Sequence, residues 1–305
     1  MISHQFTFKN KDNMKMYVYK WSPDKMVKGI IQIAHGMAET AKRYEYFAKA
    51  MTEQGYVVYA NDHRGHGNSA ASIEDLGYIS DEDGFSDMVT DMKTLTDIAK
   101  KENPGVAIIL LGHSMGSFLA QRYIQLYGKD INGVILSGTN GKPKAMVNVG
   151  IGLAKVIMSL KGRRASGKVL DSLSFKSYNK KINPLLTKFD WLSRDQEQVA
   201  LYMADPYCGT LFPVSFFYDL LNGMKLIHKK EELKRVPKDL PIYIFAGDAD
   251  PVGDYGKGVT GLYGTYQSMG IREVTCKLYP GGRHEMLNET NKDEVIEDII
   301  RWINQ

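Results

Sequence analysis

Cysteine is scarce in this chain. Only two of its 305 residues, Cys208 and Cys276, are of this type, and they stand far apart without the paired spacing of zinc ligands. Neither a disulfide framework nor a structural metal is therefore expected. Long hydrophobic runs are missing as well, because the longest continuous one, residues 106–111, is much shorter than a membrane span. The first residues lack the apolar stretch of a signal peptide, so we expect a soluble cytoplasmic protein.

Charge of one sign is not in excess either. The chain has 39 Lys and Arg against 35 Asp and Glu, a net charge of +4, which is too small at this length to indicate nucleic-acid binding. Hydrophobic residues nevertheless make up 43% of the sequence. A full-sized core can therefore form, and disordered and fibrous classes are excluded. No pattern in the chain predicts a cofactor.

Short apolar runs alternate with segments of helical spacing. The apolar runs are residues 17–21, 30–34, 56–60, 106–111, 134–137, 242–246 and 274–279, and the helical segments are 43–54, 84–101, 115–127, 256–269 and 293–303. Several runs are continuous, which is typical of strands buried on both faces. The alternation predicts an α/β fold with a mostly parallel sheet. The turn formers Lys11, Asp12 and Asn13 predict an antiparallel hairpin at its start.

The alternation fails between residues 139 and 225. This segment is rich in Met, Lys, Phe and Tyr and contains helical stretches without a convincing strand, and the strand pattern returns only at Ile242. We interpret residues 139–225 as a helical cap, or lid, inserted into a core made of residues 1–138 and 226–305.

The strongest local motif is Gly112-His113-Ser114-Met115-Gly116, between a strand pattern and a helical one. A nucleophile on such a strand-to-helix elbow has strained backbone angles, and the glycines avoid collisions with neighbouring elements. Ser114 is therefore the candidate nucleophile, at the carboxyl edge of the sheet. His113 is expected to point away from the cleft. The alternative is an ordinary surface serine in a glycine turn.

A serine hydroxyl is a poor nucleophile until a base takes its proton, and that base is usually a histidine oriented by a carboxylate. His284 lies after Gly281 and Gly282, in the loop between the last strand pattern and the final helix. A loop in this place lies at the carboxyl edge of the sheet, and its glycines allow a close approach to the elbow. His284 is therefore the candidate base.

Three aspartates compete for the role of the acid. Asp248 and Asp250 follow the strand pattern 242–246, and Asp254 is a weaker third candidate. Pro251 stiffens the loop directly after Asp250, which favours that residue over the ordinary turn position of Asp248. The chain order Ser, Asp, His is the order found in α/β-hydrolases.

A fourth motif, His35-Gly36-Met37, follows the strand pattern 30–34. Acyl transfer develops negative charge on the carbonyl oxygen, and two backbone N–H groups aimed at that oxygen stabilise it. We expect these donors to be Met37 and Met115. Gly36 lets the loop pass close to the elbow, and the ring of His35 is expected to hold the loop in place without a change of charge.

Together these motifs resemble the α/β-hydrolase superfamily, and within it the monoacylglycerol lipase and lysophospholipase group, also called serine aminopeptidase-like hydrolases. Residues 61–69, Asn-Asp-His-Arg-Gly-His-Gly-Asn-Ser, are similar to the D-x-x-G-H-G-x-S signature of that group. The resemblance implies an α/β-hydrolase core with helices on both faces of the sheet and a cap above it. It also implies a structural role for Asp62 and His66.

For the site, the resemblance implies Ser114 as nucleophile, His284 as base, Asp250 rather than Asp248 as acid, and Met37 and Met115 as oxyanion donors. The implied activity is hydrolysis of a small-molecule acyl ester, monoacylglycerol or lysophospholipid, through an acyl-enzyme and without a cofactor or metal. Two alternatives stay open. An aminopeptidase or amidase would need an acidic site in the cap, and a binding protein that had lost turnover would usually lack a triad member.

The first part of the cap combines an apolar helical face with a run of basic residues. The apolar residues on one face of 145–160 are Met146, Val149, Leu153, Val156, Ile157 and Leu160. The basic residues are Lys155, Lys161, Arg163, Arg164, Lys168, Lys176, Lys180 and Lys181, against Asp171 alone. The apolar face either packs onto the core or belongs to a lid that lines an acyl channel or touches a membrane. The basic run is either a solvated surface or a site of contact with anionic lipid or a phosphate-bearing substrate. Among later aromatic residues, Trp191 and Phe212 are candidates for a pocket wall or for plain core.

Overall fold

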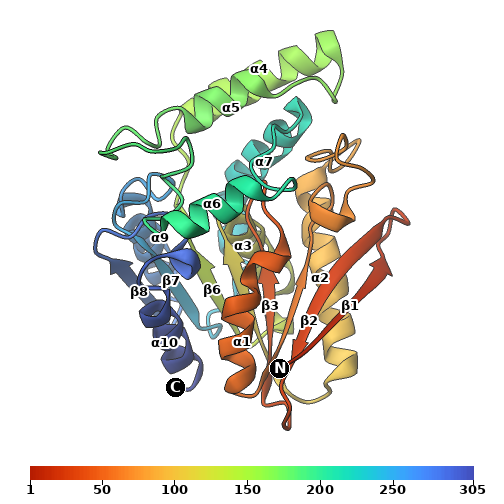
Figure 1. The fold of residues 1–305 in the computed structure, drawn as a ribbon, viewed down its shortest axis with the longest axis vertical. Coiled ribbons are helices and arrows are strands. Elements are labelled where there is room, and N and C mark those ends of the chain that lie inside the picture. Colours follow the sequence, from red (N-terminus) through yellow and green to blue (C-terminus); the bar gives the residue numbers. More distant parts are fainter.

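A computed structural model describes residues 1–305 of the chain. At its centre lies one eight-stranded sheet with the strand order β1-β2-β4-β3-β5-β6-β7-β8 (Figure 1). The strands are β1 (Ile2–Lys9), β2 (Lys15–Ser22), β3 (Gly29–Ala34), β4 (Tyr56–Asn61), β5 (Ala107–His113), β6 (Gly133–Ser137), β7 (Ile242–Gly247) and β8 (Val274–Tyr279). The β1–β2 and β2–β4 pairings are antiparallel and all others are parallel, which confirms both the mostly parallel sheet and the opening hairpin.

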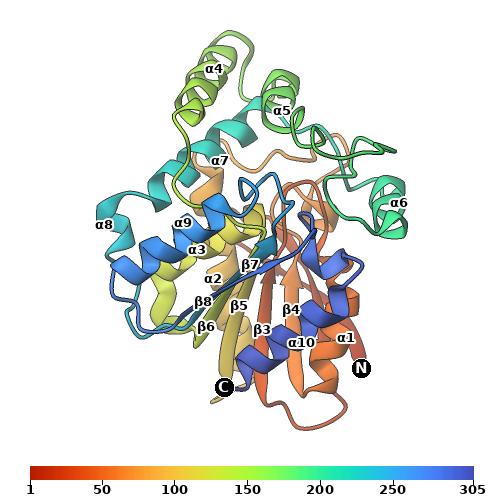
Figure 2. The same cartoon turned by 90° about the vertical axis from the view of Figure 1, so that its left-hand side faces the viewer.

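Helices cover both faces of this sheet. Helices α1 (Glu45–Glu53) and α10 (Lys292–Ile303) pack on one face, and α2 (Gly84–Glu102), α3 (Met115–Tyr127) and α9 (Lys257–Ser268) pack on the other (Figures 1 and 2). Every residue of β3, β4, β6 and β7 is buried as a result. This burial explains why their sequences are continuous apolar runs rather than alternating ones.

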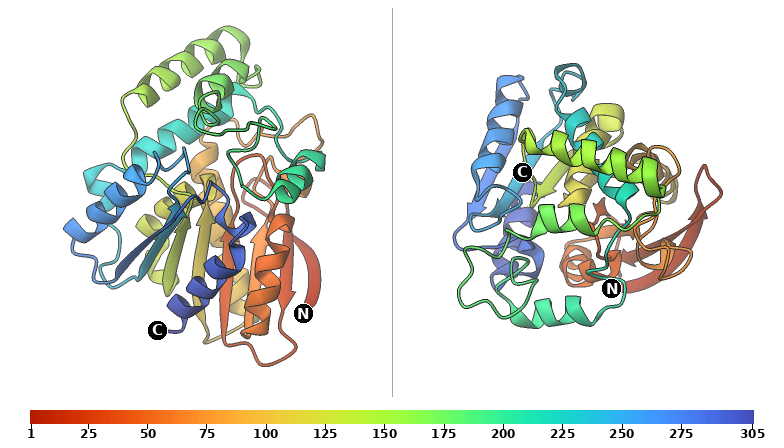
Figure 3. Two further views of the ribbon diagram at one scale, coloured as in Figure 1. Left: turned by 60° about the vertical axis from the view of Figure 1, so that its left-hand side comes forward. Right: turned by 90° about the horizontal axis from the view of Figure 1, so that it is seen from above.

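Residues 139–225 contribute helices but no strand of the sheet. The helices are α4 (Met146–Lys161), α5 (Lys168–Phe175), α6 (Gln196–Ala204) and α7 (Val214–Ile227), which continues past residue 225. The short α8 (Lys230–Leu233) then leads back to β7. They lie over the carboxyl ends of the parallel strands (Figures 1 and 3). Helix α7 packs against α2 and α3, and α4 rests on α7. No helix of the chain is both long and apolar enough to span a bilayer.

The apolar face expected on α4 points largely outward. Four of its six residues are exposed, with relative exposures of 73% at Met146, 60% at Val149, 54% at Val156 and 77% at Leu160. The helix packs through its other side: Ala154 is its one buried residue, a Cβ on Gly150 would lie 2.8 Å from Leu221 of α7, and the partly buried Leu153, Ile157 and Met158 contact the core. Packing onto the core therefore does not account for most of this apolar face.

Candidate active site

Ser114 lies at the turn from β5 into α3 with φ of 51° and ψ of −120°. A positive φ is rare for a residue with a side chain and indicates local strain. The turn is so tight that a Cβ on Gly116 would lie 2.0 Å from the carbonyl oxygen of Ala34, and one on Gly112 would lie 2.4 Å from that of Gly116. Both positions therefore require glycine. The Ser114 N–H donates to the carbonyl of Ser137 over 2.9 Å, which fixes the turn against β6.

His284 and Asp250 form a buried pair. His284 Nδ1 lies 2.9 Å from Asp250 Oδ2, and the two side chains are 2% and 0% exposed. The carboxylate accepts this hydrogen bond, so Nδ1 carries the proton and the lone pair of Nε2 remains available as a base. The second carboxylate oxygen, Oδ1, accepts from the Val252 N–H over 2.8 Å, which fixes the orientation of the Asp250 side chain.

The other two aspartates of this loop face elsewhere. Asp248 Oδ1 accepts from the Gly281 N–H over 2.7 Å, and Asp254 pairs with Lys144 over 2.9 Å at the surface. Of the three aspartates considered from the sequence, only Asp250 contacts the imidazole of His284.

The electrostatic surroundings of His284 favour its charged form. Burial by itself lowers the pKa of His284, but the charge and hydrogen bond of Asp250, together with the negative charges of Glu285 and Glu39, raise it above its ordinary value. A base with a raised pKa takes up a proton more readily, and the same charges stabilise the imidazolium that results.

The loop after β3 runs beside the elbow, as expected for a donor of oxyanion hydrogen bonds. A Cβ on Gly36 would lie only 3.2 Å from Ser114 Cβ. The ring of His35 is fully buried, and its Nε2 accepts from the His63 N–H while its Nδ1 donates to the Gly36 carbonyl. Burial lowers the pKa of His35 to about 4, so the ring holds the loop as a neutral group.

The two expected oxyanion donors have free N–H groups. Met37 lies in this loop, and its N–H donates to no acceptor in the chain. Met115 is the first residue of α3, where a backbone N–H has no intrahelical acceptor. Their role as donors to an oxyanion stays a prediction.

The end of β6 contacts both the candidate nucleophile and the candidate base. Ser137 accepts the Ser114 N–H, and a Cβ on the adjacent Gly138 would lie 3.0 Å from His284 Cε1. The Ser114 side chain is half-buried, and its hydroxyl makes no hydrogen bond to His284 or to another group of the chain. Catalytic hydrogen bonds are often long without substrate and tighten in the complex.

The expectation that His113 points away from the cleft is wrong. Its ring lies 4.8 Å from that of His284, and its Nδ1 is 3.2 Å from Ser137 Oγ. As the last residue of β5, it keeps its side chain on the buried side next to β6, and the loop carrying His284 folds over it. Burial lowers the pKa of His113 to about 4, so it remains neutral beside the base.

Asp62 supports a loop near the site. Its two carboxylate oxygens accept from the Ala41 and Asn68 N–H groups, each over 2.8 Å. His66 is buried with its ring 5.0 Å from that of Phe212, which is itself core. These contacts agree with the structural role expected for Asp62 and His66. No group of three or more His, Cys, Asp or Glu side chains is arranged to hold a metal ion.

Residues 190–194 contact the loop that carries His284, which we call the histidine loop. The ring of Trp191 is 5.0 Å from that of His284, the His284 N–H donates to the Trp191 carbonyl, and the Glu285 N–H donates to Leu192 over 2.7 Å. The Arg283 guanidinium also donates to the carbonyls of this segment. The sequence indicated that Trp191 could line a pocket, but it carried no signal that Trp191 contacts His284.

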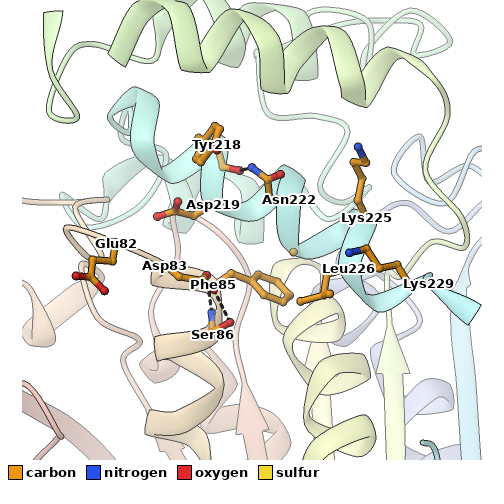
Figure 4. A pocket seen from close by; sticks show the side chains of 11 residues that line it. Glu82, Asp83, Phe85, Ser86, Tyr218, Asp219, Asn222, Lys225, Leu226 and Lys229 are labelled. Atoms are coloured by element: carbon orange, nitrogen blue, oxygen red, sulfur yellow. Dashed lines mark hydrogen bonds between the residues drawn. The ribbon is translucent and has the colours of Figure 1, made fainter. Parts of the chain in front are cut away.

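A pocket of about 350 Å³ lies elsewhere, between the start of α2 and α7 (Figure 4). Its lining is largely polar, with Glu82 and Asp83 at one end and Lys225 and Lys229 at the other. None of the candidate catalytic residues lines it. Its charged walls do not suit an acyl chain.

The sheet order, with helices on both faces and a helical segment above the strand ends, is that of an α/β-hydrolase. The chain matches the family described as "Serine aminopeptidase, S33" over residues 25–291 and belongs to it. The family resemblance inferred from the motifs is thereby confirmed.

Named relatives support the same placement. The chain is 30% identical to the monoacylglycerol lipase of Mycolicibacterium smegmatis over 286 residues, which cover 93% of this chain and 90% of that protein. It is 26% identical to human monoglyceride lipase over 302 residues, covering 97% and 89%. The crystal structure of a thermostable carboxyl esterase from Bacillus coagulans in complex with glycerol is similar with a TM-score of 0.91 and 32% identity, covering 100% of this chain and 98% of that one.

Proposed function

We propose that this chain is a serine ester hydrolase that cleaves monoacyl lipid-like esters, monoacylglycerol or lysophospholipid. The observation that carries the proposal is the strained Ser114 at the strand-to-helix turn beside the hydrogen-bonded Asp250–His284 pair. The names of the relatives support it, because lipases that act on monoacylglycerol and a carboxyl esterase are among them.

In the proposed mechanism, Ser114 Oγ attacks the ester carbonyl while His284 Nε2 takes its proton. Asp250 holds the imidazole in the required tautomer, and the N–H groups of Met37 and Met115 donate to the oxyanion. The proton then passes from His284 to the leaving alcohol as the acyl-enzyme forms. Water, deprotonated by His284, attacks the acyl-enzyme. The bond between the acyl carbon and Ser114 Oγ then breaks, His284 returns the proton to Oγ, and the carboxylic acid is released.

We also propose that residues 139–225 act as a cap over a core of residues 1–138 and 226–305. Two parts of this segment differ in attachment. Residues 190–194 are hydrogen-bonded to the histidine loop. Helices α4 and α5 lie above α7 (Figures 1 and 3). Several apolar side chains of these two helices are exposed to solvent. The exposed apolar residues of α4 and α5 define an outer surface: Met146, Val149, Val156, Leu160, Val169 and Leu173.

We propose that this outer surface binds an anionic lipid surface, from which the enzyme takes its substrate. The same segment carries exposed lysines: Lys155, Lys161, Lys168, Lys176 and Lys180. Lys181 does not join them, because its Nζ lies 3.4 Å from the centroid of the Tyr255 ring. Arg163 and Arg164 do not join them, because they pair with Asp219 and Asp75. Apolar side chains framed by unpaired cations are typical of interfacial helices, and each nearby Lys contributes about 1 kcal/mol toward an anionic membrane.

A substrate panel tests the proposed function. We expect turnover of p-nitrophenyl esters and of monoacylglycerols or lysophospholipids, measured as released nitrophenol or fatty acid, with none of aminoacyl arylamides. Background hydrolysis is measured with Ser114→Ala. Turnover of the arylamides alone would replace this proposal with a peptidase. No turnover of any substrate would favour a binding protein.

Vesicle binding tests the lipid-contact surface. The chain is expected to co-sediment with vesicles of phosphatidylglycerol and phosphatidylcholine more than with phosphatidylcholine alone. The double variant Met146→Glu, Leu160→Glu should bind at least about tenfold more weakly, because it removes two apolar contacts and adds two repelling charges. Met26→Glu is the control, since Met26 is 88% exposed and precedes the amino end of β3, away from the carboxyl strand ends that residues 139–225 cover. Equal binding by the double variant and the control would contradict the proposal.

A further inference from the structure

Three charged side chains outside the proposed triad form a buried cluster beside it. Arg43 donates two parallel hydrogen bonds to Glu285, from Nη1 to Oε1 over 2.7 Å and from Nη2 to Oε2 over 2.6 Å. Its Nη1 also donates to Glu39 Oε2 over 2.8 Å. The side chains of Arg43, Glu285 and Glu39 are 12%, 6% and 3% exposed. No step of the proposed mechanism uses them.

Each carboxylate of this cluster belongs to a different part of the active site. Glu39 Oε1 accepts from the Gly36 N–H over 2.6 Å and so holds the loop that runs beside the elbow. Glu285 directly follows His284 on the histidine loop. Arg43 therefore joins these two loops through charge-assisted hydrogen bonds, which are roughly twice as strong as neutral ones.

Residues of the proposed cap cover the cluster. The ring of Tyr202, on α6, lies 4.8 Å from the guanidinium carbon of Arg43. Its hydroxyl donates to the carbonyl of Ala38 over 2.9 Å, and the Gly209 N–H donates to the same oxygen. Ala38 has a positive φ of 54°, so these bonds hold a strained residue next to Met37. Exclusion of water strengthens the electrostatic effect of the buried charges.

Stability alone does not explain such a cluster. Burial of charges is costly, and apolar residues of similar size often stabilise a fold as well or better. The cluster holds two carboxylates and one guanidinium, and hence a net negative charge close to the imidazole. During acyl transfer that imidazole becomes positive, and fixed negative charge stabilises it without reorganisation.

We propose that Arg43 is a positioning residue, which holds the loop of Gly36 and Met37 and the histidine loop in one fixed arrangement through Glu39 and Glu285. The inference rests on the proposed function. The cluster also sets part of the charge around His284. The charged or titratable groups facing His284 are Asp250 after β7, Glu285 on its own loop, Glu39 after β3 and His113 at the end of β5, and the cap contributes the uncharged Trp191.

Two variants separate the geometry from the charge. Arg43→Lys keeps the positive charge but loses the bidentate hydrogen bonds to Glu285. We therefore expect kcat for a p-nitrophenyl ester to fall about 100-fold with KM nearly unchanged. Glu285→Gln removes one negative charge near His284, and the acidic limb of the pH profile of kcat/KM should move about one unit lower. In Arg43→Lys the limb should stay in place, because the positive charge is kept. In Glu285→Gln, the loss of a merely structural contact would not move the limb.

Glu232→Gln is the matched control, because Glu232 pairs with Arg122 between α8 and α3 and touches neither loop. It should leave kcat and the pH profile unchanged. Wild-type kcat in folded Arg43→Lys overturns the proposal, as does an unmoved acidic limb in folded Glu285→Gln, with folding checked by thermal unfolding. If the wild-type chain cleaves no ester, the proposed function itself has failed, which is a separate result.

Discussion

Ser114→Ala is expected to lower kcat for ester substrates by about 10⁶-fold, because it removes the only atom that can form the acyl-enzyme. The variant should fold normally, since alanine keeps the Cβ whose backbone is already held at a φ of 51° and the lost hydroxyl makes no hydrogen bond. The rate is measured together with the burst of nitrophenol in the first turnover. We expect the burst to vanish while the melting temperature stays within a few degrees of wild type.

Ser215→Ala is a suitable control for this experiment. Ser215 is buried in α7, and its hydroxyl also has no hydrogen-bond partner, so its removal should leave kcat unchanged and should not lower stability. If Ser114→Ala kept more than about a tenth of the wild-type kcat, Ser114 would not be the nucleophile, since loss of a nucleophile is never this mild in a triad hydrolase.

The sheet could be predicted because its signals are local. Strands buried on both faces need continuous apolar sequence, and β3, β4 and β7 have it. The opening hairpin was indicated by its turn residues, and the register Lys9 to Lys15 confirms it. Whether the apolar face of α4 is covered stayed open, because helical spacing shows that apolar residues share a face and not whether anything covers that face.

In the candidate site too, the features with local sequence signals could be predicted, and those that depend on distant contacts could not. The elbow glycines and the loop of His284 carry local patterns that a sequence displays, and Asp250 was favoured over Asp248 by one proline and by the family resemblance. The orientation of His113 was mistaken because it depends on the histidine loop, far along the chain. The Arg43 cluster was missed altogether. Arg and Glu are normally exposed, and Arg43 and Glu285 are 242 positions apart.

Asp250→Asn should lower kcat by about 10⁴-fold, although asparagine has nearly the same shape. The Val252 N–H donates to the position of Oδ1 and therefore selects the amide oxygen there. The amide nitrogen then occupies the place of Oδ2 and donates to His284 Nδ1. The imidazole is driven into the tautomer with its proton on Nε2, which cannot accept the proton of Ser114.

The pH profile provides a second readout of the same variant. The Asp250 carboxylate raises the pKa of His284, so its removal lowers that pKa. Histidine must be neutral to act as a base, and the acidic limb of the residual kcat/KM should therefore move to lower pH. A loss of activity caused by misfolding would reduce the amount of active enzyme without moving the limb.

Asp248→Asn is the matched change two residues away. Asp248 accepts from the Gly281 N–H, and an asparagine oxygen can accept the same bond, so kcat should stay within about twofold of wild type. The pair of variants decides between the two aspartates that the sequence left as rivals. If Asp248→Asn were the inactive variant, the 2.9 Å contact between Asp250 and His284 would have only a structural role. Asp248 would then be the acid, and it could reach the imidazole only after a movement of the loop.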